Sequence, residues 1–294
     1  MPSIGFIGLG HMGNPMVNNL LKNNFSVNVY DISEKAIAQC VSQGAVASQS
    51  IIDIAKNCDV VITMLQTGEQ VMQICTGKQG IFDNAAPDTL FLDCSTIDIQ
   101  SSSALHSAAK SRDMMMFDAP VSGGVAAATA GTLTFMVGGD EKNFARAENI
   151  LKFMGKKIIY AGNDTAGVAA KICNNMLLGI SMIGVCEAFV LAEKLGLDSK
   201  KLFEISSNAS GQCWSLTSYC PSPNILPSVP SSNDYKPGFS AKMMLKDLHL
   251  SQDAASFSKT ETPLGNHAMT LYEQFVAQHQ DDIDFSAIIK MLEK

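Results

Sequence analysis

The 294-residue chain has little positive charge: its 21 lysines and arginines stand against 28 aspartates and glutamates, a formal net charge of −7. Such a chain lacks the basic footprint of nucleic-acid-binding proteins, so we expect no nucleic-acid partner. Charged residues make up only 17% of the chain and hydrophobic residues 46%, unlike the composition of disordered proteins. The length predicts about two folded domains.

The eight cysteines show no CxxC pair, and no histidine lies at a spacing typical of metal ligands. We therefore expect no metal site, and reduced thiols in a cytoplasmic protein. The chain opens with Met1-Pro2-Ser3 and enters an apolar segment at once, so we expect no targeting peptide. The longest apolar run, 176–192, is interrupted by Ser181 and Glu187 and fits a buried helix better than a membrane span, so no membrane partner is expected.

Up to residue 161 the sequence alternates short apolar runs with longer segments of helical periodicity, such as 14–22 and 34–43. Nearly continuous apolar strands between helices predict a parallel, doubly wound α/β sheet of the Rossmann type. We assign residues 1–163 to this domain. The expected strands are 3–7, 27–30, 60–65, 90–93, 115–118, 133–137 and 158–160.

The pattern changes after the cap-like residues 162–165, which precede a long stretch of helical spacing that ends at Gly196. Its apolar residues fall on nearly every face, as in a helix at the centre of a domain or in a subunit interface. Residues 164–294 are expected to form an all-α domain around this long helix, to bind substrate and to join a homodimer or homotetramer. Further helices are expected at 199–208, 240–258, 263–278 and 285–292, with a proline- and serine-rich loop at 219–237.

Three glycines, Gly8, Gly10 and Gly13, form a G-x-G-x-x-G motif between the first strand and the first helix. Gly8 permits a tight turn, Gly10 lets the backbone approach a pyrophosphate, and Gly13 lets the helix pack closely. We expect these residues, with His11 and Met12 between them, to contact a dinucleotide, which makes residues 1–163 a dinucleotide-binding domain. An ordinary glycine-rich turn would give the same pattern.

Asp31 ends the second strand, where the adenosine ribose of a dinucleotide would lie. Its carboxylate can accept hydrogen bonds from ribose hydroxyls and would repel a 2′-phosphate. No arginine follows it, and Lys35 is the nearest cation, so we expect NAD rather than NADP. A simple strand-end cap is the alternative role for Asp31.

Two later strand ends carry further candidate cofactor contacts, because open α/β sheets hold ligands at the carboxyl ends of their strands. Leu65 and Gln66 follow one strand, and Ser95 and Thr96 follow another. Contacts with the phosphates or a ribose are expected there, with plain loop residues as the alternative.

After the strand that ends at Asp118, the residues Ser122, Gly123 and Gly124 form a turn of small residues. A hydroxyl and successive backbone amides in such a turn can hold a substrate carboxylate. A purely structural turn explains the pattern equally well.

Gly167, Lys171 and Asn175 are spaced four apart in the long helix and therefore share one face. A free lysine has a pKa near ~10.4, which burial and the positive ring of an oxidised nicotinamide would both lower toward that of a general base. We expect Lys171 to exchange the hydroxyl proton of the substrate, Asn175 to position the ammonium or bind the substrate, and Gly167 to leave room for a ligand. The alternative is a lysine that extends to the surface.

Lys246 and Asp247 lie in the helix expected at 240–258. Lys246 could reach the cofactor, and Asp247 the substrate hydroxyl or Lys171, although a solvated helix face is equally compatible. The four histidines other than His11 have neither triad-like nor metal-like neighbours in the sequence, so we assign them no chemistry.

Together these segments resemble the β-hydroxyacid dehydrogenase family, over essentially the whole chain. The similar segments are 8–16, 118–124 with 131–133, the helix that contains Lys171, 246–248, 210–215 and 229–239. The resemblance implies NAD-dependent oxidation of 3-hydroxyisobutyrate to methylmalonate semialdehyde, a step of valine breakdown. It implies that Lys171 is the catalytic acid/base, that substrate is held by Ser122, Gly123 and Asn175, and that the dinucleotide is contacted by Leu65, Gln66, Thr96 and Lys246.

Two residues depart from the family pattern. Gln66 stands where relatives often have proline, and Ala126 where a glycine is common, so the loops near cofactor and substrate are expected to differ slightly. Two alternatives remain: a tartronate or succinic semialdehyde type reductase, which would share every catalytic group, and a non-catalytic dinucleotide-binding protein. Asp31 argues against an NADP-linked reductase, and the presence of Lys171 and Asn175 argues against a protein without chemistry.

Overall fold

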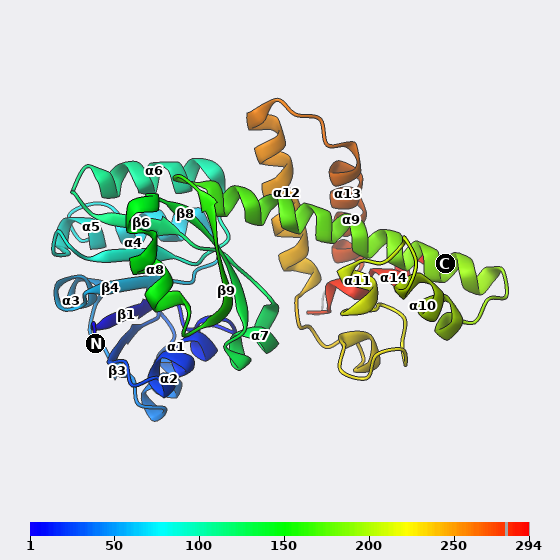
Figure 1. Ribbon diagram of the computed structural model, residues 1–294, viewed down its shortest axis with the longest axis horizontal. Coiled ribbons are helices and arrows are strands. Elements are labelled where there is room, and N and C mark those ends of the chain that lie inside the picture. Colours follow the sequence, from blue (N-terminus) through cyan, green and yellow to red (C-terminus); the bar gives the residue numbers. More distant parts are fainter. Residues whose placement is uncertain (280–281, 294) are drawn as a thin grey trace. The chain divides into compact units, whose positions relative to one another are not determined.

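The computed structural model describes residues 1–279 and 282–293, and the chain divides into two compact units, Met1–Lys171 and Ile172–Lys294. Each unit has a hydrophobic core of its own. The first unit is built on a sheet, and the second is built from helices (Figure 1).

The sheet of the first unit has nine strands within the described residues, in the order β3-β2-β1-β4-β5-β6-β8-β7, with β9 paired to β8. The first six pair in parallel, whereas β8 runs antiparallel to both β6 and β7 and parallel to β9. The strands are β1 (Ile4–Ile7), β2 (Val27–Tyr30), β3 (Val46–Ala47), β4 (Val60–Thr63), β5 (Leu90–Asp93), β6 (Met115–Asp118), β7 (Val121–Ser122), β8 (Leu133–Gly139) and β9 (Gly155–Gly162).

The expected parallel sheet is therefore confirmed for β1 to β6 and wrong for the segment that follows. An apolar run looks the same in either direction, because strand orientation depends on the connection and not on the residues of the strand. The sequence also gave no sign of β3 and β7, which are only two residues long and too short to show a period.

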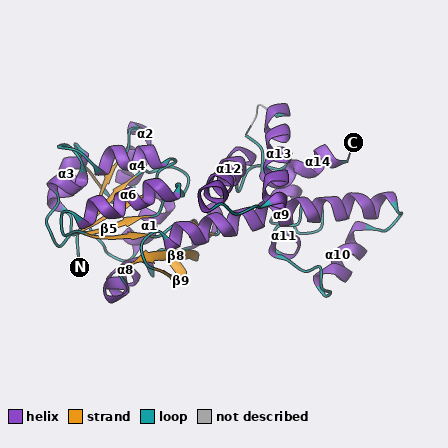
Figure 2. Cartoon of the chain, turned by 90° about the horizontal axis from the view of Figure 1, so that it is seen from above, coloured by secondary structure: helices purple, strands orange, loops and turns teal. Residues whose placement is uncertain are grey.

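Helices lie on both faces of this sheet (Figure 2). Several of them begin where a short polar side chain accepts a hydrogen bond from the third backbone N–H of the helix, as Ser33, Ser50, Thr67 and Asp98 do. The helices of this unit are α1 (Gly13–Lys22), α2 (Glu34–Ser42), α3 (Ile51–Asn57), α4 (Gly68–Cys75), α5 (Ile81–Asn84), α6 (Ile99–Lys110), α7 (Gly124–Ala130), the 3-10 helix η1 (Glu141–Asn143) and α8 (Phe144–Leu151).

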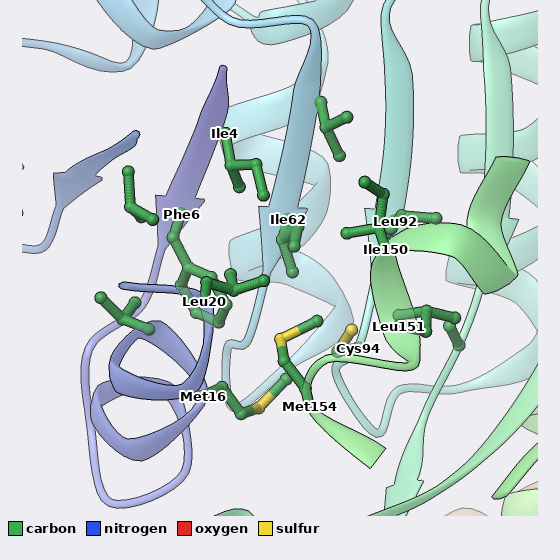
Figure 3. Close-up of a cluster of buried hydrophobic side chains, with 14 of the residues drawn as sticks. Ile4, Phe6, Met16, Leu20, Ile62, Leu92, Cys94, Ile150, Leu151 and Met154 are labelled. Atoms are coloured by element: carbon green, nitrogen blue, oxygen red, sulfur yellow. The ribbon is translucent and has the colours of Figure 1, made fainter. Parts of the chain in front are cut away.

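The core of the first unit fixes where the strands end. Every residue of β1, β4 and β5 is buried. Figure 3 shows part of this core, in which β1, β4 and β5 contribute Ile4, Phe6, Ile62 and Leu92. Because these strands are packed on both faces, the loops at their carboxyl ends start from rigid positions.

The second unit is all helical apart from loops and one isolated β-bridge between Ser240 and Asp284, within the described residues. Its first helix, α9, begins in the first unit. The helices are α9 (Ala166–Lys194), α10 (Ser199–Ser207), α11 (Trp214–Thr217), η2 (Pro230–Ser232), α12 (Ala241–Ser258), α13 (Pro263–Gln278), η3 (Phe285–Ile288) and α14 (Ile289–Leu292). An α/β sheet followed by an all-α unit with a long helix confirms the expected fold class.

The proline- and serine-rich segment 219–237 is held by one buried carboxylate. Asp284 accepts hydrogen bonds from the Tyr219 hydroxyl (2.8 Å) and from the N–H groups of Gly238 (3.0 Å) and Phe239 (3.1 Å). Burial raises the pKa of Asp284 and that of Tyr219. The loop is thus tied at both ends to the same side chain.

The long helix α9 is less buried than its composition predicted. Its most apolar window has a mean hydropathy of 1.8 and would pass for a membrane span, as a core helix also can. Leu177 and Leu191, however, are 62% and 60% exposed. The exposed residues Cys173, Leu177, Gly184, Glu187, Ala188 and Leu191 share one helix face, which we call the α9 stripe. Within a single chain, therefore, α9 is not buried on every side.

Candidate active site

The glycine loop follows β1 and leads into α1. Gly8 has a φ of +96°, a conformation that L-residues rarely adopt, and a Cβ here would lie 2.9 Å from a side-chain carbon of Leu65. Around Gly10, by contrast, no atom lies within 4 Å of the place a Cβ would take. The loop is therefore fixed by close packing at its first glycine and open at its second, which suits the approach of a ligand to the backbone.

The N-terminus of α1 suits an anion. Met12, the residue that caps it, supplies no side-chain hydrogen bond, and the first turn holds no acidic residue. The first N–H groups of a helix lack partners within the helix, and their positive end favours a phosphate. Gly10, His11, Met12 and Gly13 therefore lie at a helix N-terminus that has no side-chain cap.

Asp31 lies at the end of β2 and is half-buried. Its carboxylate accepts a hydrogen bond from the N–H of Leu9 (2.6 Å) and another from the N–H of Ser33 (2.8 Å). A carboxylate has about four acceptor positions, so two backbone donors leave room for ribose hydroxyls. Asp31 thus connects β2 to the glycine loop, a contact that sequence reasoning missed.

The ends of β4 and β5 are joined by a buried network. Asp93 accepts hydrogen bonds from the Thr63 hydroxyl (2.7 Å) and the Ser95 N–H (3.1 Å), and the Ser95 hydroxyl accepts one from the Leu65 N–H (2.9 Å). Complete burial raises the pKa of Asp93, and the charge of Asp118 raises it further. The network fixes the loop of Leu65 to that of Thr96. The predicted strand 90–93, which ends in Asp93, was a signal for it.

Gln66 and Thr96, the other expected cofactor residues of these loops, are exposed and half-buried respectively. The N–H of Gln66 donates to the side-chain oxygen of Gln70 in α4, 3.1 Å away. This contact fixes the loop at the position where relatives often have proline. The loop start is therefore ordered without a proline ring.

The small-residue turn expected at 122–124 joins β7 to α7. Ser122 is the last residue of β7 and pairs with Thr134 of β8. Gly123 and Gly124 both have positive φ, +129° and +66°, and a Cβ on Gly123 would lie 2.5 Å from that of Ala127. Only glycine fits this turn without strain. Ser122, Gly123 and Gly124 thus follow one another at the N-terminal end of α7.

Lys171 lies in α9 and is only 8% exposed. The expected burial of this lysine is therefore observed. Gly167, one turn earlier, serves a purpose other than the expected one. A Cβ on Gly167 would lie 2.5 Å from the backbone oxygen of Asp118, so this glycine lets α9 pack against the sheet and does not leave space for a ligand.

In the second unit, Asn175 and Asp247 meet. The side-chain N–H of Asn175 in α9 donates to a carboxylate oxygen of Asp247 in α12, 2.5 Å away. The two residues are 1% and 3% exposed. Both were expected near the substrate, and the structure shows them as one hydrogen-bonded pair. Lys246 precedes Asp247 and is half-buried.

His106 was assigned no chemistry, yet the structure places carboxylates on both sides of its ring. Its Nε2 lies 2.8 Å from an oxygen of Asp118, and its Nδ1 lies 3.5 Å from one of Asp164. These residues come from α6, β6 and the turn before α9, so nothing in the local sequence brings them together. The described residues include no group of three or more histidines, cysteines or acidic residues able to hold a metal ion, and these three are no exception.

Two family models match the chain, one in each half. A family model described as the NAD binding domain of 6-phosphogluconate dehydrogenase matches residues 3–162. A second model, described as NAD-binding of NADP-dependent 3-hydroxyisobutyrate dehydrogenase, matches residues 165–292. The chain therefore contains an NAD-binding domain of an oxidoreductase.

Relatives and solved structures match over the full length. The chain is 45% identical over 293 residues to a Pseudomonas aeruginosa protein named NAD-dependent L-serine dehydrogenase, covering 100% of this chain and 98% of that one. It is 43% identical to human mitochondrial 3-hydroxyisobutyrate dehydrogenase, covering 98% of this chain and 86% of that one. A solved structure of Mycobacterium tuberculosis 3-hydroxyisobutyrate dehydrogenase with L-serine matches with a TM-score of 0.95 and 44% identity, covering 100% of both chains. The chain belongs to the 3-hydroxyisobutyrate dehydrogenase family of NAD-binding hydroxyacid dehydrogenases.

Proposed function

We propose that the protein oxidises 3-hydroxyisobutyrate to methylmalonate semialdehyde with NAD, as a step of valine breakdown, and that Lys171 is the general acid/base. The observation that carries this proposal is a lysine only 8% exposed on the same helix face as the buried Asn175. When bound, NAD supplies the nicotinamide ring that accepts a hydride from the carbon bearing the hydroxyl group.

Lys171 takes the proton of the substrate hydroxyl as the alcohol is oxidised, and returns it in the reverse direction. Burial disfavours the charged form of a lysine, and the positive ring of the oxidised cofactor does so too. Both effects bring the amine toward the proton affinity that a general base needs at neutral pH. Asn175, held by Asp247, orients the hydroxyl group beside the amine.

The substrate carboxylate is held by Ser122, Gly123 and Gly124. The hydroxyl of Ser122 and the backbone amides of the two glycines are donors that suit an anion. The chain as a whole carries a net charge of −7, so these local donors have to outweigh a repulsive overall field.

We propose that residues 1–163 form the dinucleotide domain and 164–294 the substrate and subunit-joining domain. The pyrophosphate lies at the α1 N-terminus, against Gly8, Gly10, His11, Met12 and Gly13. The adenosine ribose binds Asp31, whose negative charge disfavours the 2′-phosphate of NADP. Further contacts come from Leu65, Gln66, Thr96 and Lys246.

L-Serine is a second candidate substrate. A relative at 45% identity is named for it, and the related solved structure contains it. Both compounds are 3-hydroxyacids and differ only in the group at C2, a methyl or an ammonium, so the side chains that face this group decide between them. The same catalytic groups serve either substrate.

We further propose a homodimer or homotetramer that uses the α9 stripe, since exposed leucines on one helix face mark an interface. The cytoplasm is the proposed location. All eight cysteines are unpaired, which fits a reducing compartment. Neither a membrane nor a nucleic acid is a proposed partner.

A substrate panel tests the proposal. The purified protein is assayed with 3-hydroxyisobutyrate, L-serine, 3-hydroxypropionate, glycerate and 4-hydroxybutyrate, each with NAD and with NADP at matched concentrations. The highest kcat/KM is expected for 3-hydroxyisobutyrate with NAD. A higher kcat/KM for L-serine would mean that L-serine, and not 3-hydroxyisobutyrate, is the substrate. A higher kcat/KM for glycerate or 4-hydroxybutyrate would indicate a semialdehyde reductase. The absence of turnover on any of them would indicate a non-catalytic protein.

A further inference from the structure

We propose that Asp118 is a positioning residue for Lys171: its buried carboxylate holds the first turn of α9, and His106 holds that carboxylate in place. This inference rests on the proposed function, in which Lys171 is the general acid/base. Asp118 acts through the helix that carries the lysine, without contact with the substrate.

Asp118 is the last residue of β6 and is completely buried. One of its carboxylate oxygens accepts a hydrogen bond from the N–H of Thr165 (3.0 Å), and the other accepts one from the N–H of Val168 (2.7 Å). Thr165 immediately precedes α9, and Val168 lies in its first turn. The carboxylate of a distant strand therefore caps this helix.

A carboxylate suits this position for two physical reasons. The first N–H groups of a helix have no acceptor within the helix, and a buried one without a partner costs about 1–3 kcal/mol. The positive end of the helix also favours a negative charge beside it. Asp118 meets both needs, so the start of α9 is fixed relative to β6.

Tight packing prevents the first turn from moving closer to the sheet. A Cβ on Gly138 of β8 would lie 2.6 Å from a carboxylate oxygen of Asp118 and 2.6 Å from the N–H nitrogen of Gly167. A Cβ on Gly167 would lie 2.9 Å from the other oxygen of Asp118. The two glycines therefore allow the carboxylate, the strand and the helix to touch.

His106 fixes the carboxylate itself. Its ring is 5% exposed, and its Nε2 lies 2.8 Å from the same Asp118 oxygen that faces Thr165. Its Nδ1 lies 3.5 Å from Asp164, the residue before Thr165. Hence α6, β6 and the turn before α9 are joined through one imidazole ring, and rotation of the Asp118 side chain would break this contact.

The consequence concerns Lys171, which lies three residues after Val168. At ~1.5 Å of rise per residue the two are separated by less than one turn of the same helix, so a displacement of the first turn displaces the lysine. A misplacement of ~1 Å can cost about 10²-fold in rate when a reacting group has to meet its partner. Asp118 and His106 thus fix the first turn of the helix that carries the amine.

The experiment compares Asp118→Asn with Asp198→Asn. Asp198 caps α10 by accepting from the Lys201 N–H (3.1 Å), so the control makes the same chemical change at another helix N-terminus. For Asp118→Asn we expect kcat to fall at least roughly tenfold and the Kd for NAD to stay within about twofold, as for a group needed only in the transition state. Asp198→Asn should leave kcat within about twofold of the wild type. An unchanged kcat for Asp118→Asn would overturn the proposal.

A double variant distinguishes this inference from the proposed function. In a Lys171→Ala background, Asp118→Asn should cause no further loss of kcat, because residues that act through one another are not additive. A full additional loss would show that Asp118 acts independently of the lysine and would overturn the inference. Normal turnover of Lys171→Ala alone would instead overturn the proposed function.

His106 offers a test that leaves the cap itself intact, should Asp118→Asn not fold. His106→Leu removes the donor to Asp118, whereas His106→Gln keeps an N–H donor on a side chain of similar reach. We expect kcat to fall roughly threefold to tenfold in His106→Leu, with most of it restored in His106→Gln. Equal activity of the two variants would contradict a positioning role for the ring.

Discussion

The carboxylate of Asp31 accepts a hydrogen bond from the N–H of Leu9, 2.6 Å away, and so joins the end of β2 to the glycine loop. The proposed selectivity for NAD depends on the negative charge at this position. Asp31→Asn keeps the shape and an acceptor but removes the charge. We expect the ratio of kcat/KM for NAD to that for NADP to fall roughly tenfold, a factor equal to ~1.4 kcal/mol.

Asp59→Asn is the matched control. Asp59 directly precedes β4, at the amino end of the parallel strands, whereas Asp31 follows β2 at their carboxyl end. Asp59 also accepts a hydrogen bond from a backbone N–H, that of Ser3 (2.7 Å). Its NAD to NADP ratio should equal that of the wild type. A wild-type ratio in Asp31→Asn as well would show that the carboxylate does not select the cofactor.

Lys171→Ala should lower kcat by at least ~10²-fold, the lower end of what a general acid/base supplies. Fluorescence titration should show that NAD still binds. Lys194→Ala, at the exposed end of the same helix, should keep wild-type kcat. Turnover near the wild-type level in Lys171→Ala would end the role proposed for this lysine.

The buried pair of Asn175 and Asp247 predicts a stability effect. Asn175→Ala leaves a carboxylate oxygen of Asp247 without the N–H that it meets in the wild type, at a cost of about 1–3 kcal/mol in the free energy of unfolding. Urea unfolding measures this cost. Asn208→Ala removes an exposed side-chain bond to the Glu204 backbone and should cost less than about 0.5 kcal/mol. An equal loss of unfolding free energy in the two variants would mean that the buried pair stabilises the fold no more than an exposed hydrogen bond does.

Asp93 predicts a pH dependence of stability, since burial raises the pKa of its carboxyl. Below the unfolded pKa of ~3.9, folded and unfolded chains both hold the proton. As pH rises above that value the unfolded chain releases its proton first, so the folded state loses stability until its own carboxyl ionises. Asp93→Asn removes this titration. The free energy of unfolding of the variant relative to the wild type should therefore increase from pH 4 upward, and a constant difference would contradict the burial argument.

The reaction rates of the cysteine thiols test whether the α9 stripe is covered in an oligomer. Burial raises the pKa of Cys58 and of Cys220 to about 11, and Cys75, Cys94 and Cys186 are shifted in the same direction, so these thiols should react slowly. Cys173 is exposed on the stripe. With a thiol reagent, we expect it to react quickly in dilute solution and to become protected as protein concentration rises.

Cys173→Ser should abolish this concentration-dependent phase, while Cys213→Ser, at a half-buried thiol outside the stripe, should not. Sedimentation of the same samples gives the oligomeric state. A reaction of Cys173 that is equally fast at every concentration would argue against an interface on the stripe.

The sequence by itself determined the features that depend on neighbouring residues. The glycine motif, the alternation of apolar runs and helices, and the spacing of Lys171 and Asn175 are local patterns, because the periods of strands and helices are imposed within a few residues. Family membership followed from the same segments. The burial of Lys171 could be predicted because its neighbours along the helix are apolar.

The tertiary structure alone decided which side chains meet. Strand β8 reverses direction, and Asp118 reaches an N–H group fifty residues along the chain, while Asn175 and Asp247 are separated by 72 residues. His106 gained its two carboxylate neighbours only because α6, β6 and the start of α9 converge. Such contacts arise from the packing of distant segments, and no local period encodes them, which is why the sequence showed the lysine but not the carboxylate that caps the start of its helix.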